Sequence, residues 1–209
     1  MKYLSQISIS KKEAIKKGFV DSYAWHKALW KAFPGQDGKC RDYLSRIDSK
    51  DRYYQILLLS NQRPTLPDWG QWQTKEVTSS FLEYELYRFE LRANPTVKRI
   101  VRDNDRTRKK NGRRTSICDR NELKLWIYRK AQEAGFEIYN DKLEISAPVK
   151  QSFIRNGSIG KHSKVDFKGI LKVVNRELFK KAFSRGIGSA KSFSFGMLVL
   201  QPIKIDIKN

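Results

Sequence analysis

The chain has few of the side chains that commonly hold metal ions. Its 209 residues include only two cysteines, Cys40 and Cys118, and two histidines, His26 and His162. None of the four lies in the short spacing of a zinc motif, and no group of Asp and Glu matches a magnesium site. We therefore expect no metal ion and no other cofactor, so that any chemistry on a phosphodiester would come from side chains alone.

Long apolar runs are also missing. No segment approaches the roughly 20 apolar residues that a membrane helix needs. The first residues, 1–7 (MKYLSQI), alternate apolar and polar positions as a strand does and lack the apolar core of a signal peptide. We therefore expect a cytoplasmic protein that does not contact a membrane. With 39% hydrophobic and 12% aromatic residues, the chain is expected to fold.

Acidic residues are scarce beside basic ones. Lys and Arg number 43 against 22 Asp and Glu, for a formal net charge of +21. Such an excess repels itself in the folded state, and a polyanionic partner relieves that repulsion. Nucleic acid is the first candidate partner and a membrane surface the second, while a generally basic soluble protein is the plainest alternative.

The order of predicted elements repeats along the chain. The first half reads as a strand over 2–8, a helix capped by Asp21 or Ser22 and ending near Phe33, strands over 43–47 and 53–60, a short helix near Trp69 and Trp72, and a strand over 75–78. The second half reads as a strand over 87–92, a basic loop over 98–114, a helix over 121–134 stopped by Gly135, extended segments over 136–145 and 149–154, a turn over 156–160, a strand over 165–174, a helix over 176–183 and a strand over 196–205. This α+β order predicts two tandem ferredoxin-like (RRM-like) βαββαβ domains, residues 1–80 and 81–209.

The first predicted helix carries side chains suited to cutting RNA. Tyr23, His26 and Trp30 share one face, with Lys27 and Lys31 beside them. A histidine exchanges protons near neutral pH, lysine charge stabilises a phosphorane, and a tyrosine hydroxyl hydrogen-bonds a ribose 2′-hydroxyl. Attack of that hydroxyl on the adjacent phosphate would leave 2′,3′-cyclic phosphate and 5′-hydroxyl ends without a metal. The alternative is a histidine that is simply packed among aromatics.

Three further segments favour contact with RNA. Residues 98–114 hold nine basic residues against Asp103 and Asp105, a local net charge of +7; the alternative is a solvated loop. Residues 155–164 predict a basic hairpin that follows the phosphates of a stem, or else an exposed turn. Residues 185–196 predict a glycine-rich loop, but its order of helix, loop and strand matches neither a P-loop nor a dinucleotide motif. The candidate RNA-binding residues are Lys27, Lys31, Arg92, Arg102, Arg106, Arg108, Lys109, Lys110, Arg113, Arg114, Arg155, Lys161, His162, Lys164, Arg185, Gly186, Gly188 and Lys191.

Three stretches together resemble one protein family. Residues 23–30 (YAWHKALW), 89–95 (FELRANP) and 186–192 (GIGSAKS) are similar to the CasE family, the pre-crRNA endoribonucleases of subtype I-E Cascade. One departure is Ser194, where the family often has a further glycine. The resemblance implies two ferredoxin-like domains around a central RNA-binding cleft. It also implies cleavage of CRISPR repeat stem-loops at the 3′ base of the stem.

The same resemblance assigns roles and partners. His26 matches the catalytic histidine of the family and Tyr23 its assisting tyrosine. Lys27 and Lys31 fall where basic residues lie near the scissile phosphate, and the remaining matches, on the groove-binding hairpin, are Arg155, Lys161 and Lys164. The implied partners are the pre-crRNA repeat hairpin, the mature crRNA that stays bound, and other Cascade subunits, namely backbone and Cas5-type proteins.

Two other functions compete with this one. A non-catalytic subunit that binds structured RNA in a ribonucleoprotein would share the fold, although the presence of both Tyr23 and His26 favours the nuclease. A basic DNA-binding protein is the other candidate, but the chain lacks a helix-turn-helix or zinc-finger pattern. A mechanism that uses the 2′-hydroxyl could not cut DNA.

Overall fold

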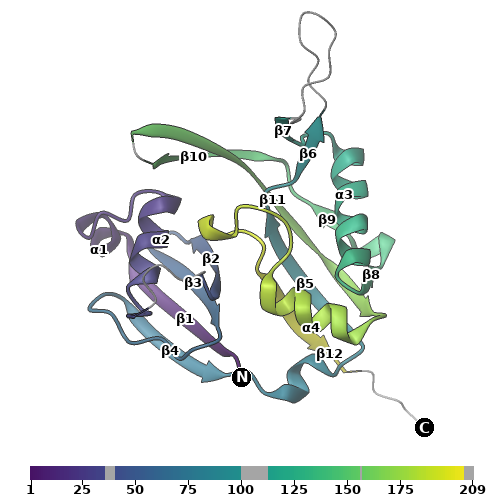
Figure 1. The fold of residues 1–209 in the computed structure, drawn as a ribbon, viewed down its shortest axis with the longest axis horizontal. Helices are drawn as coiled ribbons and strands as arrows, with labels where there is room; N and C mark the ends of the chain where they lie inside the picture. The colour runs from purple at the N-terminus through teal and green to yellow at the C-terminus, as the bar shows by residue number, and fades with distance from the viewer. Residues whose placement is uncertain (36–40, 100–112, 156, 205–209) are drawn as a thin grey trace, which may run out of the picture.

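The computed structural model describes residues 1–35, 41–99, 113–155 and 157–204, without the side chains of Arg113 and Arg155. Its described residues form two large antiparallel sheets, each with helices against one face, that lie side by side, and a separate two-stranded sheet (Figure 1). The first sheet comes from the N-terminal part of the chain and the second from the remainder.

The N-terminal sheet has the strand order of a ferredoxin-like fold. Its elements are β1 (Tyr3–Ser10), α1 (Lys11–Lys16), α2 (Ser22–Trp30), β2 (Tyr43–Ser49), β3 (Tyr53–Ser60) and β4 (Gln71–Glu76). The strands lie in the order β2-β3-β1-β4, and every neighbouring pair is antiparallel. Alternation along β1 buries Ile7 and Ile9 against the helices while Gln6 is exposed, which is the period of two that predicted this strand.

One local prediction for this half was wrong. The short helix expected near Trp69 and Trp72 is absent, because Trp69 is buried in a bend and Trp72 already belongs to β4. Gly70 turns the chain there at a positive φ of 64°, in a position where a Cβ would lie 3.0 Å from the carbonyl oxygen of Ser8. In addition, the basic stretch after β1 forms the helix α1, capped by Ser10.

Helix α2 is positioned by its cap and its buried face. Asp21 caps it, with Oδ1 accepting the N–H groups of Tyr23 and Ala24 at 2.9 and 2.8 Å. Trp25 and Leu29 are buried against the sheet. The helix periodicity therefore turns Tyr23 and His26 away from the centre of the core.

The second sheet has the same central order. The strands and helices of this half of the chain are β5 (Leu86–Ala93), β6 (Thr96–Arg99), β7 (Arg113–Ser116), α3 (Arg120–Glu133), β8 (Phe136–Ile138), β9 (Glu144–Ile145), β10 (Val149–Arg155), β11 (Ser158–Val173), α4 (Arg176–Arg185) and β12 (Leu198–Ile203). Its 3₁₀ turns are η1 (Ser79–Leu82), η2 (Asn140–Lys142) and η3 (Lys191–Phe193). The sheet order is β10-β11-β5-β12, with β8 and β9 also pairing with β11. Helices α3 and α4 cover one face.

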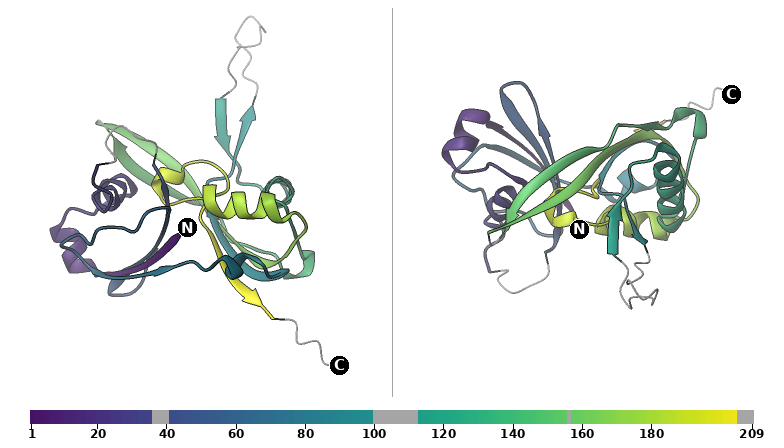
Figure 2. Two further views of the ribbon diagram at one scale, coloured as in Figure 1. Left: turned by 60° about the horizontal axis from the view of Figure 1, so that its bottom comes forward. Right: turned by 90° about the horizontal axis from the view of Figure 1, so that it is seen from above.

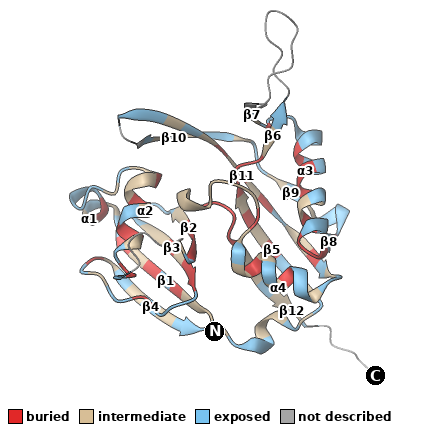
Figure 3. Cartoon of the chain, in the orientation of Figure 1, coloured by how far each residue is buried: buried red, intermediate tan, exposed pale blue. Residues whose placement is uncertain are grey.

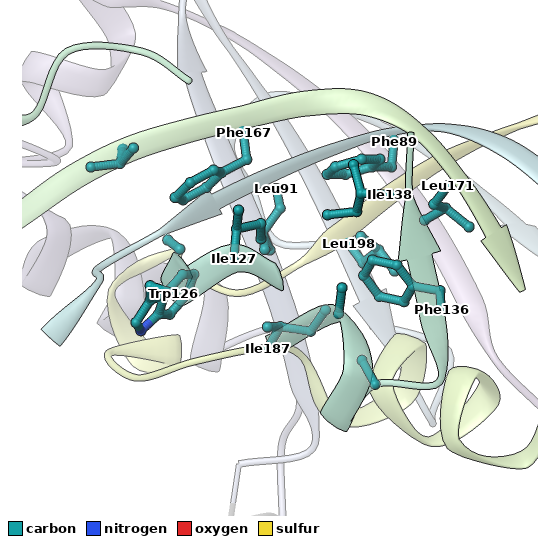
Figure 4. Packing of buried hydrophobic residues seen from close by; sticks show 14 of the residues in the cluster. Phe89, Leu91, Trp126, Ile127, Phe136, Ile138, Phe167, Leu171, Ile187 and Leu198 are labelled. Carbon is teal, nitrogen blue, oxygen red and sulfur yellow. The ribbon is translucent and has the colours of Figure 1, made fainter. Parts of the chain in front are cut away.

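The second core lies between this sheet and α3. The rings of Trp126 and Phe167 stack 5.7 Å apart, and Ile127 packs beside them (Figure 4). Buried positions concentrate where the helices meet the sheets, while the outer helix faces are exposed (Figure 3). Burial of such large apolar side chains is the main source of stability for each half.

Two further expectations need correction. The basic segment is not a loop throughout, because its ends pair as β6 and β7, with Val97 opposite Thr115. The extended segment over 136–145 is broken by η2 into β8 and β9. Strand β11 runs for 16 residues, so that it spans the second sheet and also forms a hairpin with β10 that reaches over α2 (Figures 1 and 2).

An ion-pair network joins the two sheets. Arg46 of β2 is buried and pairs with Glu90 of β5 at 2.7 Å. Arg92 of β5 pairs with Asp48 of β2 at 2.8 Å. Turn η1 links β4 to β5 along the chain, and the division into domains at residue 80 stays a prediction.

Candidate nucleic-acid interface and active site

His26 is held by a tyrosine that the sequence did not single out. The hydroxyl of Tyr43, on β2, lies 3.2 Å from Nδ1 of His26 and donates to the carbonyl oxygen of His26 at 3.2 Å. Burial raises the pKa of Tyr43 far above its ordinary value, although Arg41 opposes the shift, so the phenol stays neutral. The phenol has one proton. When that proton goes to the carbonyl oxygen, the phenol oxygen accepts from Nδ1, and this arrangement leaves the basic lone pair of the ring on Nε2.

The other predicted catalytic groups lie on the same helix edge. Tyr23 is half-buried one turn before His26, and the ammonium group of Lys27 lies 5.0 Å from the centre of the Tyr23 ring. Lys31, at the C-cap of α2, is exposed like Lys27. The structure therefore gathers an imidazole, a phenol and two cations on one side of α2.

The glycine-rich loop closes against this region. Turn η3 packs on α2 and β2, and the hydroxyls of Ser194 and Ser45 are hydrogen-bonded at 3.0 Å in a buried position. Ser194 has a φ of 65°, in the left-handed region that favours glycine. A Cβ at Gly186 would lie 2.8 Å from Leu44, so this glycine serves packing between the loop and β2. Gly188 also has a positive φ, of 85°.

His162 is enclosed by aromatic rings. It stacks on Phe153 at 4.7 Å and also contacts Phe193 and Phe195. Burial lowers its pKa, and its Nε2 is buried without a hydrogen-bond partner in the described part of the chain. These surroundings suit a neutral ring that packs the β10–β11 hairpin onto the glycine-rich loop, rather than a side chain that reaches for RNA.

Arg92 is likewise occupied within the protein. Its guanidinium donates to both carboxylate oxygens of Asp166, and also to Asp48 and the carbonyl oxygen of Ile47. Burial alone would lower the pKa of Arg92, but these partners raise it above its ordinary value. The geometry therefore favours a role for Arg92 in holding the sheets together over direct contact with RNA.

The remaining predicted contacts are spread over several elements. Lys161 is exposed and Lys164 half-buried on the hairpin, and Arg114 and Arg185 are exposed on β7 and at the end of α4. Lys191 is half-buried beside further cations. The predictions that lie outside the described residues or side chains are Arg102, Arg106, Arg108, Lys109, Lys110, Arg113 and Arg155.

Two kinds of feature are absent from the described residues. No three His, Cys, Asp or Glu side chains there gather as a metal site. None of the described helices is long and apolar enough to cross a membrane. Cys118 is an exposed thiol, and Cys40 lies outside the described residues.

Comparison with known proteins decides the family. A family model described as "CRISPR associated protein" matches residues 2–202. The CRISPR system Cascade subunit CasE of Escherichia coli K12 is 30% identical over 194 residues, which cover 88% of this chain and 93% of that protein. This chain belongs to the CasE family of CRISPR-associated proteins. The resemblance inferred from residues 23–30, 89–95 and 186–192 is thereby confirmed.

Solved structures of this family share the fold. The crystal structure of Cas6e from E. coli K-12 superimposes with a TM-score of 0.75 at 26% identity, covering 96% of this chain and all of the other. Cse3 of Thermus thermophilus, bound to an RNA that represents a pre-cleavage complex, has a TM-score of 0.78 at 22% identity, covering 96% and 99%. The prediction of tandem ferredoxin-like units for this CasE-family chain is confirmed.

Proposed function

We propose that this protein is a metal-independent endoribonuclease that cuts the repeat stem-loops of pre-crRNA. The observation that carries the proposal is the contact of His26 with Tyr43, which fixes the ring and directs proton exchange to Nε2. A histidine with only a packing role would not require cations on the same helix edge. Binding of a phosphodiester would require them, because the phosphodiester is negatively charged. Family membership with the Cascade subunit CasE supports RNA as the substrate.

The reaction follows from these side chains. The ribose 2′-hydroxyl attacks the adjacent phosphorus, a P–O bond forms, and the bond to the 5′ oxygen of the next nucleotide breaks. The 2′-hydroxyl gives up one proton and the departing oxygen gains one, and Nε2 of His26 is the proton-exchanging atom. Tyr23 hydrogen-bonds the 2′-hydroxyl, while Lys27 and Lys31 stabilise the charge on the phosphorane. The products carry 2′,3′-cyclic phosphate and 5′-hydroxyl ends.

The remaining proposals concern binding and partners. Cse3 of T. thermophilus has been seen bound to RNA, and CasE of E. coli is a Cascade subunit. By analogy, Lys161, an exposed lysine of the β10–β11 hairpin, follows the phosphates of the repeat stem. After the cut, the protein keeps the 3′ hairpin of the mature crRNA and assembles with backbone and Cas5-type Cascade subunits in the cytoplasm.

The test is cleavage of a labelled repeat hairpin in EDTA. Wild type should cut and leave a 2′,3′-cyclic phosphate, whereas His26→Ala should bind the hairpin and leave it intact. An all-DNA hairpin should not be cut. Binding without cutting by both proteins would replace the nuclease with the non-catalytic RNA-binding subunit, and a cut that EDTA abolishes would remove the metal-free mechanism.

A further inference from the structure

A cationic pocket of about 440 Å³ lies between the glycine-rich loop, α3 and the β6–β7 hairpin. Its lining includes five basic side chains from three separate segments, namely Lys98, Arg114, Arg129, Lys130 and Lys191. Among the residues that the structure describes, no carboxylate lines it. Arg129 and Lys130 were not among the residues that sequence reasoning selected, because on a surface helix they look like ordinary solvated cations.

The charge of this pocket is poorly balanced by the protein itself. Glu133, outside the lining, pairs with Lys130 at 2.5 Å and with Arg129 at 3.8 Å. Lys98, Arg114 and Lys191 have no carboxylate partner within the described ranges. One carboxylate thus balances only part of the charge of five cations. Like charges held this close favour the binding of an anion.

The pocket adjoins the proposed active site through Arg41. Burial lowers the pKa of Lys191, and the nearby charges of Arg41, Arg185 and Lys130 lower it further. Arg41 lies 5.3 Å from the centre of the Tyr43 ring. Its Nη1 is buried and has no hydrogen-bond partner among residues that the structure describes. Turn η3, which begins at Lys191, packs on α2, so this side of the pocket lies beside the helix that carries His26.

The pocket wall is also fixed in shape. A Cβ at Gly188 would meet the ring of Trp126 at 3.4 Å, and the hydroxyl of Ser189 donates to the carbonyl oxygen of Asn94 at 3.2 Å. The loop thus lies close against α3 and is hydrogen-bonded to the residue that follows β5, where it borders the pocket. A rigid concave wall with convergent cations binds phosphate more tightly than the same charges on mobile side chains.

We propose that this pocket binds backbone phosphates of the RNA strand that runs past His26, next to the bond that is cut. The inference rests on the proposed function, since it takes the substrate to be RNA. It adds Arg129 and Lys130 as RNA-binding residues. It also assigns the pocket to the strand at the cleavage site, whereas the β10–β11 hairpin holds the stem.

The first experiment compares Arg129→Gln/Lys130→Gln with Lys124→Gln, an exposed lysine on the same helix that does not line the pocket. Glutamine keeps the helix but removes the charge. The double variant should bind the repeat hairpin about tenfold more weakly, and its log–log salt dependence should be shallower by roughly 0.7 to 0.9 for each phosphate that the protein no longer neutralises. Lys124→Gln should bind like wild type. Thermal unfolding of each protein confirms that it is folded.

The second experiment locates the phosphates. Single methylphosphonates, which are neutral, are placed at each position around the scissile bond. One or two positions near that bond should weaken binding to wild type but have no further effect in the double variant, because the cations that meet those phosphates are already absent. If methylphosphonates weakened RNA binding equally in both proteins at every position, the proposal that the pocket binds these phosphates would be overturned.

The outcomes separate the two proposals. A wild type that binds and cuts the hairpin, beside a double variant that matches Lys124→Gln, overturns the pocket alone. A wild type that does not bind the hairpin overturns the proposed function and the pocket with it. A double variant that binds the hairpin as tightly as wild type but cuts it slowly would also overturn the proposal, because the pocket would then not contribute to RNA affinity.

Discussion

Asp21 and Ile154 join the two halves of the molecule at the start of the helix that carries His26. The Oδ1 atom of Asp21 caps α2, while Oδ2 accepts the backbone N–H of Ile154 in β10 at 2.9 Å. One carboxylate thus fixes the first turn of the helix and holds the hairpin above it. The hairpin proposed to bind the stem is therefore linked directly to the helix proposed to cut it.

Replacing Asp21 by Asn tests this link. Asparagine retains the capping oxygen, but its NH₂ group would face the N–H of Ile154, so the bond between the halves is lost while the cap survives. We expect slower single-turnover cleavage by about fivefold to tenfold, consistent with loss of one hydrogen bond of about 1 kcal/mol. Asp119→Asn is the matched control, since Asp119 caps α3 through Glu122 alone. Equal cleavage by both variants would show that the link does not position the helix.

Removing the hydroxyl of Tyr43 tests how His26 is held. Tyr43→Phe keeps the ring stacked on Phe33 but removes the partner of Nδ1. Cleavage should fall by about tenfold with RNA affinity unchanged, because the ring stays in place and only part of the roughly hundredfold to ten-thousandfold contribution of general acid–base catalysis is lost. The pH profile should also move, because the tautomer is no longer fixed. Tyr54→Phe, on the same sheet against Trp25, should cleave normally. An unchanged rate in Tyr43→Phe would remove its positioning role.

Ser194 combines an unfavourable backbone with a favourable hydrogen bond. Ser194→Ala keeps the left-handed strain and leaves the hydroxyl of Ser45 buried without its partner, at an expected loss of about 1 to 3 kcal/mol. Ser194→Gly loses the same bond but relieves the strain by up to about 1 kcal/mol. Urea unfolding should therefore rank wild type first, glycine second and alanine last. Alanine above glycine would mean that the strain is negligible.

Stability should fall in acid because of Asp48. Burial pushes the pKa of Asp48 up, but the charges and hydrogen bonds of Arg46 and Arg92 outweigh it and hold the pKa below its ordinary value. A depressed carboxyl pKa stabilises the fold above the unfolded pKa of about 3.9, and the effect is lost as the pH falls through the folded pKa. Asp48→Asn should thus lower the free energy of unfolding at pH 7 by about 2 kcal/mol and lose less than wild type between pH 5 and pH 3. Parallel curves for the two proteins would contradict this.

Local sequence patterns predicted most of the helices and strands but few of the side-chain contacts between them. Strand β3 was predicted with its observed bounds because its apolar run is bounded by polar residues, and Asp21 was recognisable as a cap from its place before the helix. The contact of Tyr43 with His26 has no local signature, since the two residues belong to different elements that only the folded sheet brings together. The same holds for His162, whose aromatic neighbours come from β10 and the glycine-rich loop.

The role of each charged side chain was the property that local sequence predicted least well. Arg92 looked like an RNA contact because composition alone does not show that Asp166 and Asp48 would take up its guanidinium. Conversely, Arg129 and Lys130 looked ordinary until the loop carrying Lys191 was placed opposite them. Whether a basic side chain is available to RNA is decided by its neighbours in space, which lie far away in the sequence.

The bond between Ser45 and Ser194 also bears on the order in which the site is assembled as the chain is synthesised. The two residues are 149 positions apart, so a growing chain completes the helix with His26 long before it makes the loop that packs against it. Until Ser194 emerges, the cationic pocket has no wall and β2 lacks its covering loop. A partly translated chain therefore has the helix of His26 but lacks both the buried hydrogen bond of Ser45 and the loop that borders the pocket.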